Sequence, residues 1–489
     1  MALDMIIRGG QVVTPWGVGH WDIGVQGERI AAIAEPGALP DAGARILDAT
    51  GKIVIPGGIE PHAHAAFKFV YPWALEAGHR AAGPDEISKA CAFGGTTTVV
   101  DFANWRPGGA LIDAIGNRDE IFRGNSYTDY SFHTVLVGMG TEGATREQPI
   151  PIPLDLITQI GGVIEAGFSS FKVWTTNTTS TRARQMTDFG AVFGMMEQIV
   201  AHGGMLAVHA EDEDIVMYMS RVLHEQGKTH TRFLPTAHPA LSEDLSFRRV
   251  IRLAEVTGAA IYLMHVSAKE GVQAIAEARS KGLPVFAETL HHYATFPASV
   301  YDTEDGPLYH TYPSLKYEDD NEALWQGLIN GTIQTVATDA ILCARDLKLG
   351  GHTIEDTVGG NPGVEERVAI TYTEGVVKRG MSLRRFVDVT SSNAAKILGM
   401  YPRKGAIAPG SDADIVLLDP TVRKPLGLED LHGVDHSVWE GWDIHAWPTT
   451  TILRGKIIVQ DGQLLGALTD GRLIADRRTS PEILTGPAC

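Results

Sequence analysis

The sequence predicts an α/β protein: a (β/α)8 TIM barrel with a smaller β-sandwich domain built from both chain termini. Short β-branched runs alternate with helical patterns through the middle of the chain, and strand-rich segments flank that middle on both sides. Polar side chains suited to metal binding follow several of the apolar runs. A chain of 489 residues also exceeds the size at which one hydrophobic core keeps growing, which favours one large and one smaller domain.

The two flanks have the pattern of sandwich strands. In the first flank, apolar runs separated by Gly-containing turns predict strands at 5–7, 11–14, 23–25, 30–33 and 46–47. The far flank repeats this pattern at 413–418 and 451–459. We therefore assign 1–55 to the N-terminal part of the sandwich, 56–402 to the barrel, and 403–489 to the C-terminal part of the sandwich and a tail.

The middle of the chain supplies the barrel elements. Strands are expected at 96–102, 132–137 and 285–288, beside those that end at the candidate metal ligands. Apolar residues at helical spacing predict helices between the strands, for instance at 154–166, 193–202 and 272–280.

Six candidate metal ligands follow one another along this middle, each near the end of an apolar run. They are His62, His64, Lys172, His209, His265 and Asp339. Alternate residues of a strand point to the same side, so the first two imidazoles can reach one ion. A barrel gathers the carboxyl ends of its strands at one face, where ligands from different strands can converge. A lone histidine or lysine would more often be structural, but the ordered set favours a two-metal hydrolase.

Lysine is the unusual member of the set, because an ammonium cannot bind a cation. A neutral Lys172 that captures carbon dioxide forms a carbamate, whose two oxygens can bridge metals about 3.5–4 Å apart. A water between the ions then becomes a hydroxide nucleophile near neutral pH. Asp339 can take the proton of that water and deliver it to the leaving nitrogen. Zn suits these ligands best, and Mn, Co, Fe or Ni also accept them.

Several motifs together make the chain resemble the cyclic amidohydrolases of the dihydropyrimidinase and D-hydantoinase type, in the amidohydrolase superfamily. The resemblance covers essentially the whole length. The motifs occupy residues 56–64, 94–98, 170–172, 208–211, 265–267, 362–367, 393–397 and 405–414.

The resemblance implies two divalent ions, with His62, His64 and Asp339 around one, His209 and His265 around the other, and carboxylated Lys172 between them. It implies that a metal-bridging hydroxide attacks the ring carbonyl of a hydantoin- or dihydropyrimidine-like ureide or imide. It also implies a homotetramer. Within the same class, an allantoinase or a hydrolase of another imide, lactam or amide stays open. A non-catalytic assembly protein on the same fold is a remoter alternative, because such relatives have lost metal ligands that this chain keeps.

Three positions depart from the family pattern. The family usually has a tyrosine five residues after the bridging lysine, where its hydroxyl donates to the oxyanion, whereas this chain has Asn177. A shorter amide donor there would leave more of the stabilisation to the metals. Ala340 stands where a histidine usually follows the aspartate, and His291 stands where a small residue often contributes to substrate binding.

Other residues are candidates for the substrate pocket. Phe67 and Phe69 lie in an aromatic loop after the first barrel strand, and Trp174 lies two residues beyond Lys172. They predict a bulky apolar or aromatic ring substituent, although the same rings could pack against a neighbouring subunit. Gly360 and Asn361 could present backbone groups to an amide ring, or simply form a Gly/Pro turn.

The composition of the chain indicates which kinds of partner it can bind. The 41 Lys and Arg residues against 59 Asp and Glu give a net charge of −18, which opposes binding to nucleic acid or an anionic membrane, although acidity also serves solubility. Cys91, Cys343 and Cys489 are too few and scattered for a disulfide framework, which suggests a reducing compartment. No secretory signal or bilayer-spanning run is evident. We expect a cytoplasmic enzyme that acts on a small molecule.

Overall fold

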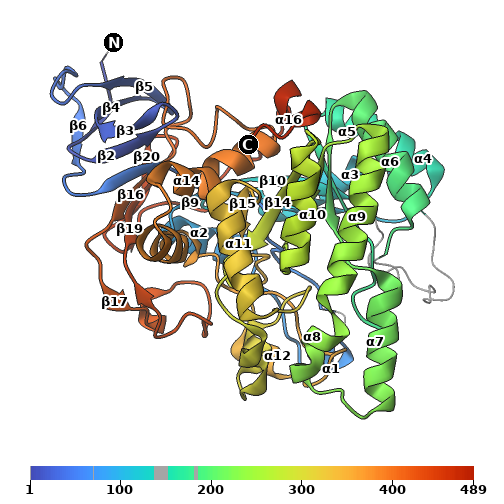
Figure 1. Cartoon of the computed structure of the whole chain (residues 1–489). Coiled ribbons are helices and arrows are strands. Elements are labelled where there is room, and N and C mark those ends of the chain that lie inside the picture. The colour runs from blue at the N-terminus through green and yellow to red at the C-terminus, as the bar shows by residue number, and fades with distance from the viewer. Residues whose placement is uncertain (1, 70, 137–151, 181–185) are drawn as a thin grey trace.

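A computed structural model describes residues 2–69, 71–136, 152–180 and 186–489, and it confirms the predicted fold class. The sandwich contains two sheets, and blue N-terminal strands lie beside orange-red C-terminal ones in Figure 1. The first sheet has the order β5 (Arg29–Ala34), β4 (Asp22–Gln26), β1 (Met5–Arg8) and β6 (Arg45–Asp48). The second has the order β21 (Gln463–Leu464), β20 (Lys456–Gln460), β19 (Trp447–Leu453), β16 (Ile415–Asp419), β7 (Ile53–Pro56), β2 (Gln11–Thr14) and β3 (Gly17–His20).

Strand β7 joins the two ends of the chain. It pairs antiparallel with β16, where Val54 faces Leu417, and parallel with β2, where Val54 faces Val12. These three side chains are buried in one apolar cluster of the sandwich. Strand β3 was not predicted, because glycines alternate with the exposed residues Val18 and His20 in it and it lies at the sheet edge.

The barrel is a parallel sheet of eight strands. In sheet order they are β8 (Gly58–Glu60), β9 (Thr96–Asn104), β10 (Asp129–Val135), β11 (Ser170–Trp174), β12 (Met205–His209), β13 (Ile261–Leu263), β14 (Val285–Leu290) and β15 (Thr335–Ala337). The two edges meet beyond β8 and β15, where the backbone N–H of His64 donates to the carbonyl of Ala340 at 2.8 Å and that of Ala340 donates to His62 at 3.2 Å. These bonds bring the first and last strands together at their carboxyl ends.

Helices cover the outside of the barrel (Figure 1). The longer ones are α2 (Pro84–Phe93), α3 (Asp113–Phe122), α6 (Phe189–His202), α7 (Glu213–Glu225), α9 (Ala240–Thr257), α10 (Lys269–Ser280) and α11 (Glu318–Asn330). Shorter ones are α1 (Pro72–Glu76), α4 (Leu154–Thr158), α5 (Ile160–Glu165), α8 (Leu234–Ala237), α12 (Arg345–Leu349), α13 (Arg367–Thr371), α14 (Leu383–Val387), α15 (Asn393–Ile397) and α16 (Pro481–Thr485).

The predicted elements differ from the observed ones mainly at their ends. The helix expected at 154–166 is split at Gln159, whose side chain accepts a hydrogen bond from the Leu111 N–H and which precedes two glycines. Helix α6 begins earlier than predicted, because Asp188 caps it by accepting from the Ala191 N–H. The end of the strand predicted at 132–137 falls at residue 137, outside the described residues.

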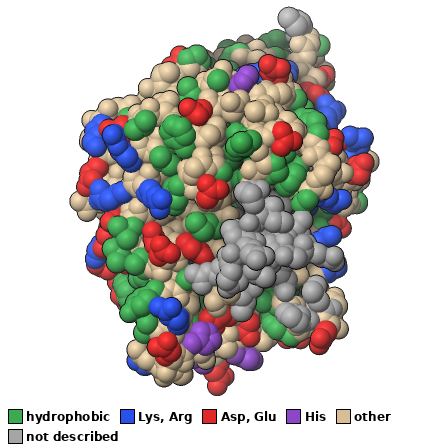
Figure 2. Space-filling model, turned by 90° about the vertical axis from the view of Figure 1, so that its right-hand side faces the viewer, with side chains coloured by type: hydrophobic (Ala, Val, Ile, Leu, Met, Phe, Trp, Pro, Cys, Tyr) green, Lys and Arg blue, Asp and Glu red, His purple; other side chains and the backbone are tan. Residues whose placement is uncertain are grey.

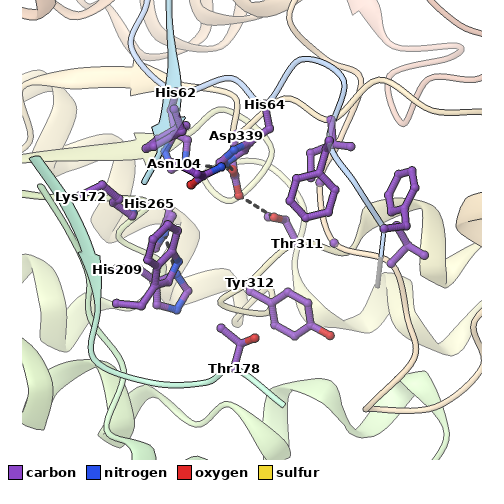
Figure 3. Close-up of a pocket in the computed structure, with 18 of the residues that line it drawn as sticks. His62, His64, Asn104, Lys172, Thr178, His209, His265, Thr311, Tyr312 and Asp339 are labelled. Atoms are coloured by element: carbon purple, nitrogen blue, oxygen red, sulfur yellow. Dashed lines mark hydrogen bonds and ion pairs between the residues drawn. The ribbon is translucent and has the colours of Figure 1, made fainter. Parts of the chain in front are cut away.

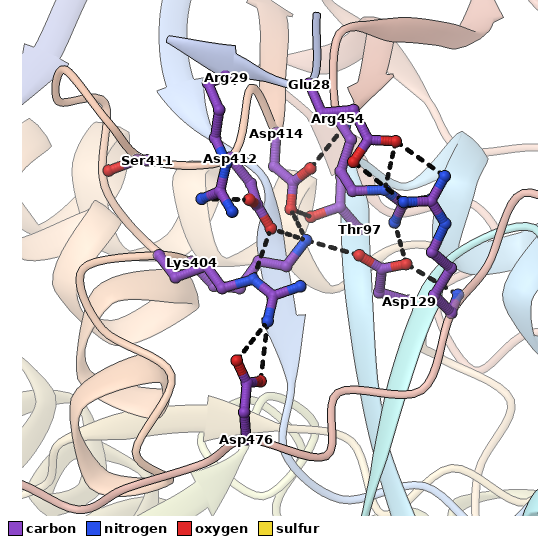
Figure 4. Close-up of polar contacts among 12 residues, drawn as sticks. Glu28, Arg29, Thr97, Asp129, Lys404, Ser411, Asp412, Asp414, Arg454 and Asp476 are labelled. Carbon is purple, nitrogen blue, oxygen red and sulfur yellow. Dashed lines mark hydrogen bonds and ion pairs between the residues drawn. The ribbon is translucent and has the colours of Figure 1, made fainter.

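A buried charge network joins the barrel to the sandwich (Figure 4). The Lys404 ammonium donates to Asp129 and Asp414, each at 2.6 Å, and lies 3.0 Å from Asp412. Arg454, at the turn between β19 and β20, also pairs with Asp129. The three carboxylates lie close enough to resemble a cation site, but the lysine of the chain itself supplies the positive charge there.

The C-terminal tail returns from the sandwich to the barrel. The Ile474 N–H donates to the carbonyl of Tyr130 near the start of β10 at 2.8 Å. Arg477 is fully buried and donates to the hydroxyl of Ser170, the first residue of β11, at 3.0 Å. Residues 474–477 therefore lie over the amino ends of two barrel strands.

Hydrophobic side chains lie among charged and neutral ones on the helical face that Figure 2 shows, over the part of it that the structure describes. Exposed apolar residues include Leu154 of α4 and Tyr218 of α7. In the described ranges, no helix combines the length and the apolar character that crossing a membrane requires.

Candidate metal centre and active site

All six predicted ligands line one pocket at the carboxyl ends of the barrel strands (Figure 3). His62 and His64 follow β8, His209 ends β12, His265 comes two residues after β13, and Asp339 two residues after β15. Lys172 lies inside β11 rather than at its end, because that strand continues to Trp174, which pairs with His209. The barrel thus gathers side chains from five strands at one face.

His62, His64 and Asp339 form the tighter group. The Nε2 atoms of both histidines lie 3.0 Å from Oδ1 of Asp339, and the three donor atoms lie within 4.8 Å of one another. Thr311 donates its hydroxyl to the other carboxylate oxygen of Asp339 at 2.8 Å. Two imidazole nitrogens and a carboxylate oxygen that face one point suit a divalent transition metal.

His209 and His265 form the second group. Nδ1 of His209 lies 2.9 Å from Nε2 of His265, and Nε2 of His209 lies 3.0 Å from the Glu211 carboxylate. Within the described residues, Nδ1 of His265 has no hydrogen-bond partner. Glu211 therefore fixes one nitrogen of His209 and leaves the other facing the pocket.

Two of the six residues have a left-handed backbone. The φ angle is +42° at His265 and +52° at Asp339, a region that residues other than glycine seldom adopt. Such conformations cost free energy and persist where surrounding contacts enforce them, often at functional sites. Here the left-handed conformations turn the side chains of His265 and Asp339 into the pocket, two residues after β13 and β15 end.

Lys172 is buried and has no carboxylate within ion-pair distance among the described residues. Its Nζ lies 2.7 Å from the sulfur of Met264. It also lies over the rings of Trp174 and Phe102, 5.0 and 5.8 Å from their centroids. Burial lowers the pKa of Lys172 to about 7, so a large fraction of the amine is neutral at neutral pH. A neutral, buried amine between two histidine groups fits a lysine that is to be carboxylated.

Two glutamates that the sequence reasoning missed support these histidines from behind. Glu288 lies 2.5 Å from Nδ1 of His62 and also accepts from the Tyr262 hydroxyl at 2.7 Å. Burial opposes protonation of His62, but Asp339 and Glu288 together raise the pKa of His62 to about 9. Burial alone would raise the pKa of Glu211, yet His238 and His209 hold it well below its ordinary value. Carboxylates in such places orient metal-binding imidazoles.

Comparison with known proteins shows the family of the chain. The model of the amidohydrolase family matches residues 53–458. The chain belongs to the amidohydrolase family. It is 34% identical over 474 residues to a D-hydantoinase of Geobacillus stearothermophilus, covering 95% of this chain and 94% of that one. A D-hydantoinase of Ralstonia pickettii is 32% identical over 482 residues, covering 97% and 99%. The crystal structure of dihydropyrimidinase from Brevibacillus agri superposes with a TM-score of 0.86 at 32% identity, covering 97% and 99%.

The pocket of this amidohydrolase contains four of the predicted substrate-binding residues: Phe67, Phe69, Trp174 and Gly360. It also contains residues that the sequence reasoning did not single out, namely Tyr71, Phe102, Asn104, Thr178, Thr311, Tyr312, Ile341, Val358 and Gly359. Asn104 is the last residue of β9, so its place at a barrel strand end was a signal that could have found it. The walls are mainly aromatic, and the ligand candidates form the polar end.

Three predicted site residues lie elsewhere. Asn177 does not line the pocket: its amide donates to Glu213 at 2.9 Å, and its side-chain carbonyl accepts from the Met186 N–H at 3.1 Å. Both ends of the amide are thus engaged by residues outside the pocket lining, and its oxyanion role stays a prediction. The same loop instead presents Thr178 to the pocket, with a φ of +67°.

The side chains of His291 and Asn361 are also outside the pocket lining. His291 is buried and stacks on Trp439, with ring centroids 5.1 Å apart. Asn361 is buried as well, and its backbone carbonyl accepts from the Ile341 N–H at 3.2 Å. Asn361 thus connects two pocket loops through its backbone.

Proposed function

We propose that this amidohydrolase opens a cyclic amide, of the hydantoin or dihydropyrimidine type, with two divalent ions held by His62, His64, Lys172, His209, His265 and Asp339. The observation that carries the proposal is the convergence of these six side chains in one aromatic pocket at the strand ends. Relatives named D-hydantoinase and dihydropyrimidinase, similar over nearly the whole chain, support the substrate class.

The metal chemistry follows from the donor set. We propose Zn as the resident ion, with Mn, Co, Fe or Ni as alternatives, and a carboxylated Lys172 between the two positions. Such a pair of ions supplies a hydroxide-strength nucleophile at neutral pH and polarises the ring carbonyl. The chain itself provides a buried, partly neutral lysine, four imidazoles and one carboxylate for this purpose.

Asp339 is our proposed proton carrier. Its Oδ1 faces both His62 and His64, and Thr311 fixes its Oδ2 through the hydrogen bond at 2.8 Å. A carboxylate held by both oxygens keeps its orientation while it accepts a proton from the attacking water and passes it to the ring nitrogen that leaves.

Thr178 is our proposed donor to the developing oxyanion, in place of Asn177. Its hydroxyl belongs to a residue that lines the pocket on the side opposite Thr311 and Asp339 in Figure 3. The loop that carries it is fixed by Glu213, which accepts from the Thr176 hydroxyl and the Asn177 N–H, each at 2.8 Å. A fixed hydroxyl near developing charge stabilises a transition state more than a mobile one.

The aromatic wall favours a ring substrate with an apolar or aromatic substituent. Phe67 and Phe69 lie edge to face with centroids 5.5 Å apart, and both line the pocket. An allantoin-like ring with a polar ureido group has less to gain from this wall. We keep the allantoinase, imide and lactam hydrolase activities as alternatives that the same assay separates.

The test measures ring opening of dihydrouracil, hydantoin, a 5-aryl hydantoin, allantoin, phthalimide and a simple lactam, with the metal content of the protein determined in parallel. Hydrolysis that disappears in Lys172→Ala, together with metal loss, supports the proposal. Near two metals per chain without hydrolysis of any ring would reject the substrate class. Absence of bound metal would reject the catalytic proposal and favour the assembly-protein alternative.

A homotetramer and a cytoplasmic location stay predictions from the resemblance and the composition. Light scattering of the purified chain and fractionation of the source cells test them.

A further inference from the structure

Lys348 is a buried lysine that the proposed mechanism does not use. It lies in α12, and its side chain is fully shielded from solvent. Its Nζ donates to three backbone carbonyls, those of His310 at 2.7 Å, Val358 at 2.7 Å and Gly360 at 2.8 Å. An ammonium has three N–H donors, so all three are used.

These three carbonyls belong to two separate walls of the pocket. His310 directly precedes Thr311 and Tyr312, which both line the pocket, and Thr311 orients Asp339. Val358 and Gly360 line the pocket from the other wall. The two segments are almost fifty residues apart in the chain, and Lys348 contacts both through one nitrogen.

The two walls approach each other closely at this point. A methyl group added at Gly359 would lie 2.8 Å from the Tyr312 ring, on the wall at 310–312. One added at Gly360 would lie 2.6 Å from Ile341, a pocket residue outside both walls. Gly360 has a φ of +100°, which other residues seldom adopt. A small change in the spacing of the walls would therefore change the shape of the pocket directly.

We propose that Lys348 is a positioning residue that fixes the shape of the substrate pocket, by binding the wall at residues 310–312 to the wall at residues 358–360. The proposal rests on the proposed function for its kinetic consequences. The geometric part concerns only the two walls, so it can be tested on its own.

The charge of Lys348 matters for this role. A neutral amine offers two N–H donors to three carbonyls, so one contact is lost. Burial lowers the pKa of Lys348 to about 8, opposed by Cys343 and Asp339. His292 and His436 also face it, and its charge lowers their pKa values. All three hydrogen bonds of Lys348 are therefore present near pH 7, and one is lost as the pH rises above about 8.

The experiment compares wild type with Lys348→Met, which fills similar space without donors, and Lys348→Gln, which keeps an amide donor. Hydrogen exchange is measured for peptides that cover residues 305–315 and 355–362, beside metal content and the kinetics of a 5-aryl hydantoin. We expect faster exchange of both peptides in Lys348→Met, unchanged metal content, and a KM raised about tenfold with a smaller fall in kcat. The exchange rates and the KM of Lys348→Gln should lie between those of wild type and Lys348→Met. If Lys348→Met does not fold, Lys348→Gln alone is compared with wild type.

The matched control is Lys316→Met. Lys316 is also buried, but its Nζ donates to the carbonyl of Ser314 within its own loop at 2.8 Å. The Lys316→Met substitution should leave the hydrogen exchange of residues 355–362 and the KM unchanged. Unchanged exchange in the Lys348 variants, or a KM that stays within twofold of wild type, would overturn the proposal. If wild type opens no ring, the proposed function fails, and the exchange data still decide whether Lys348 holds the walls.

Discussion

Replacing Glu288 by glutamine tests whether the carboxylates behind the histidines govern metal binding. Glu288 lies 2.5 Å from Nδ1 of His62 and accepts from Tyr262 at 2.7 Å, inside a fully buried site. Glutamine keeps the shape and one acceptor but removes the charge. Hydrogen bonds to charged groups contribute roughly 1.5–3 kcal/mol against about 0.5–1.5 kcal/mol for neutral ones. The difference of roughly 1–1.5 kcal/mol predicts about a tenfold loss of metal affinity, within the range known for such partners.

The assay dialyses metal-loaded protein against a graded series of chelator concentrations and counts metal per chain by plasma mass spectrometry. The control is Glu366→Gln, a buried carboxylate that accepts from the Ser437 hydroxyl at 2.6 Å instead of supporting a histidine. We expect the chelator midpoint to fall about tenfold in Glu288→Gln and to stay near wild type in Glu366→Gln. Equal midpoints for both variants and wild type would refute the argument, because the charge behind His62 would then have no effect on the site.

Three other residues, Lys172, Thr178 and Lys404, give further predictions. Because the pKa of Lys172 is lowered to about 7, the neutral amine predominates above that pH, so metal-free protein held at one concentration of dissolved carbon dioxide should take up metal roughly tenfold faster at pH 8 than at pH 6. Equal rates would argue against carboxylation. Thr178→Val keeps the β-branched shape and the backbone but removes the hydroxyl, and kcat should fall about a hundredfold with metal content unchanged. A kcat within twofold would exclude the oxyanion role. Lys404→Met leaves buried carboxylates without their cation and should cost about 3–5 kcal/mol in chemical denaturation. The exposed Lys378→Met should cost less than about 1 kcal/mol, and equal losses would contradict the account.

The sequence predicted the barrel and the residues at its strand ends because both depend on local patterns. Apolar runs mark the strands, and a polar residue after each run marks the catalytic face, so His62 and Asp339 could be placed together although they are far apart in the chain. Glu288 could not be recognised in the same way. It ends a predicted strand like many glutamates, and only the closed barrel brings it to His62.

Our proposal of Thr178 in place of Asn177 depends on another such contact. Glu213, at the start of α7, binds the Asn177 amide, and the spacing of residues in the sequence does not reveal this contact. The contacts of Lys348 likewise join two loops, and the spacing of residues in the sequence does not reveal that these loops meet. The division at residues 55/56 and 402/403 stays a prediction: β7 ends at Pro56 and β8 begins at Gly58.

The sandwich made from both termini affects how the chain can be synthesised and folded. Strand β7 needs β16, which lies more than 350 residues later, before its second edge is paired. During translation, one edge of β7 therefore stays unpaired until the barrel residues have been synthesised. The tail residues 474–477 that cover β10 and β11 are synthesised later still. We expect that the second sheet of the sandwich is completed only after β16 and β19 have been synthesised, and that removing these C-terminal strands destabilises the N-terminal part of the sandwich as well.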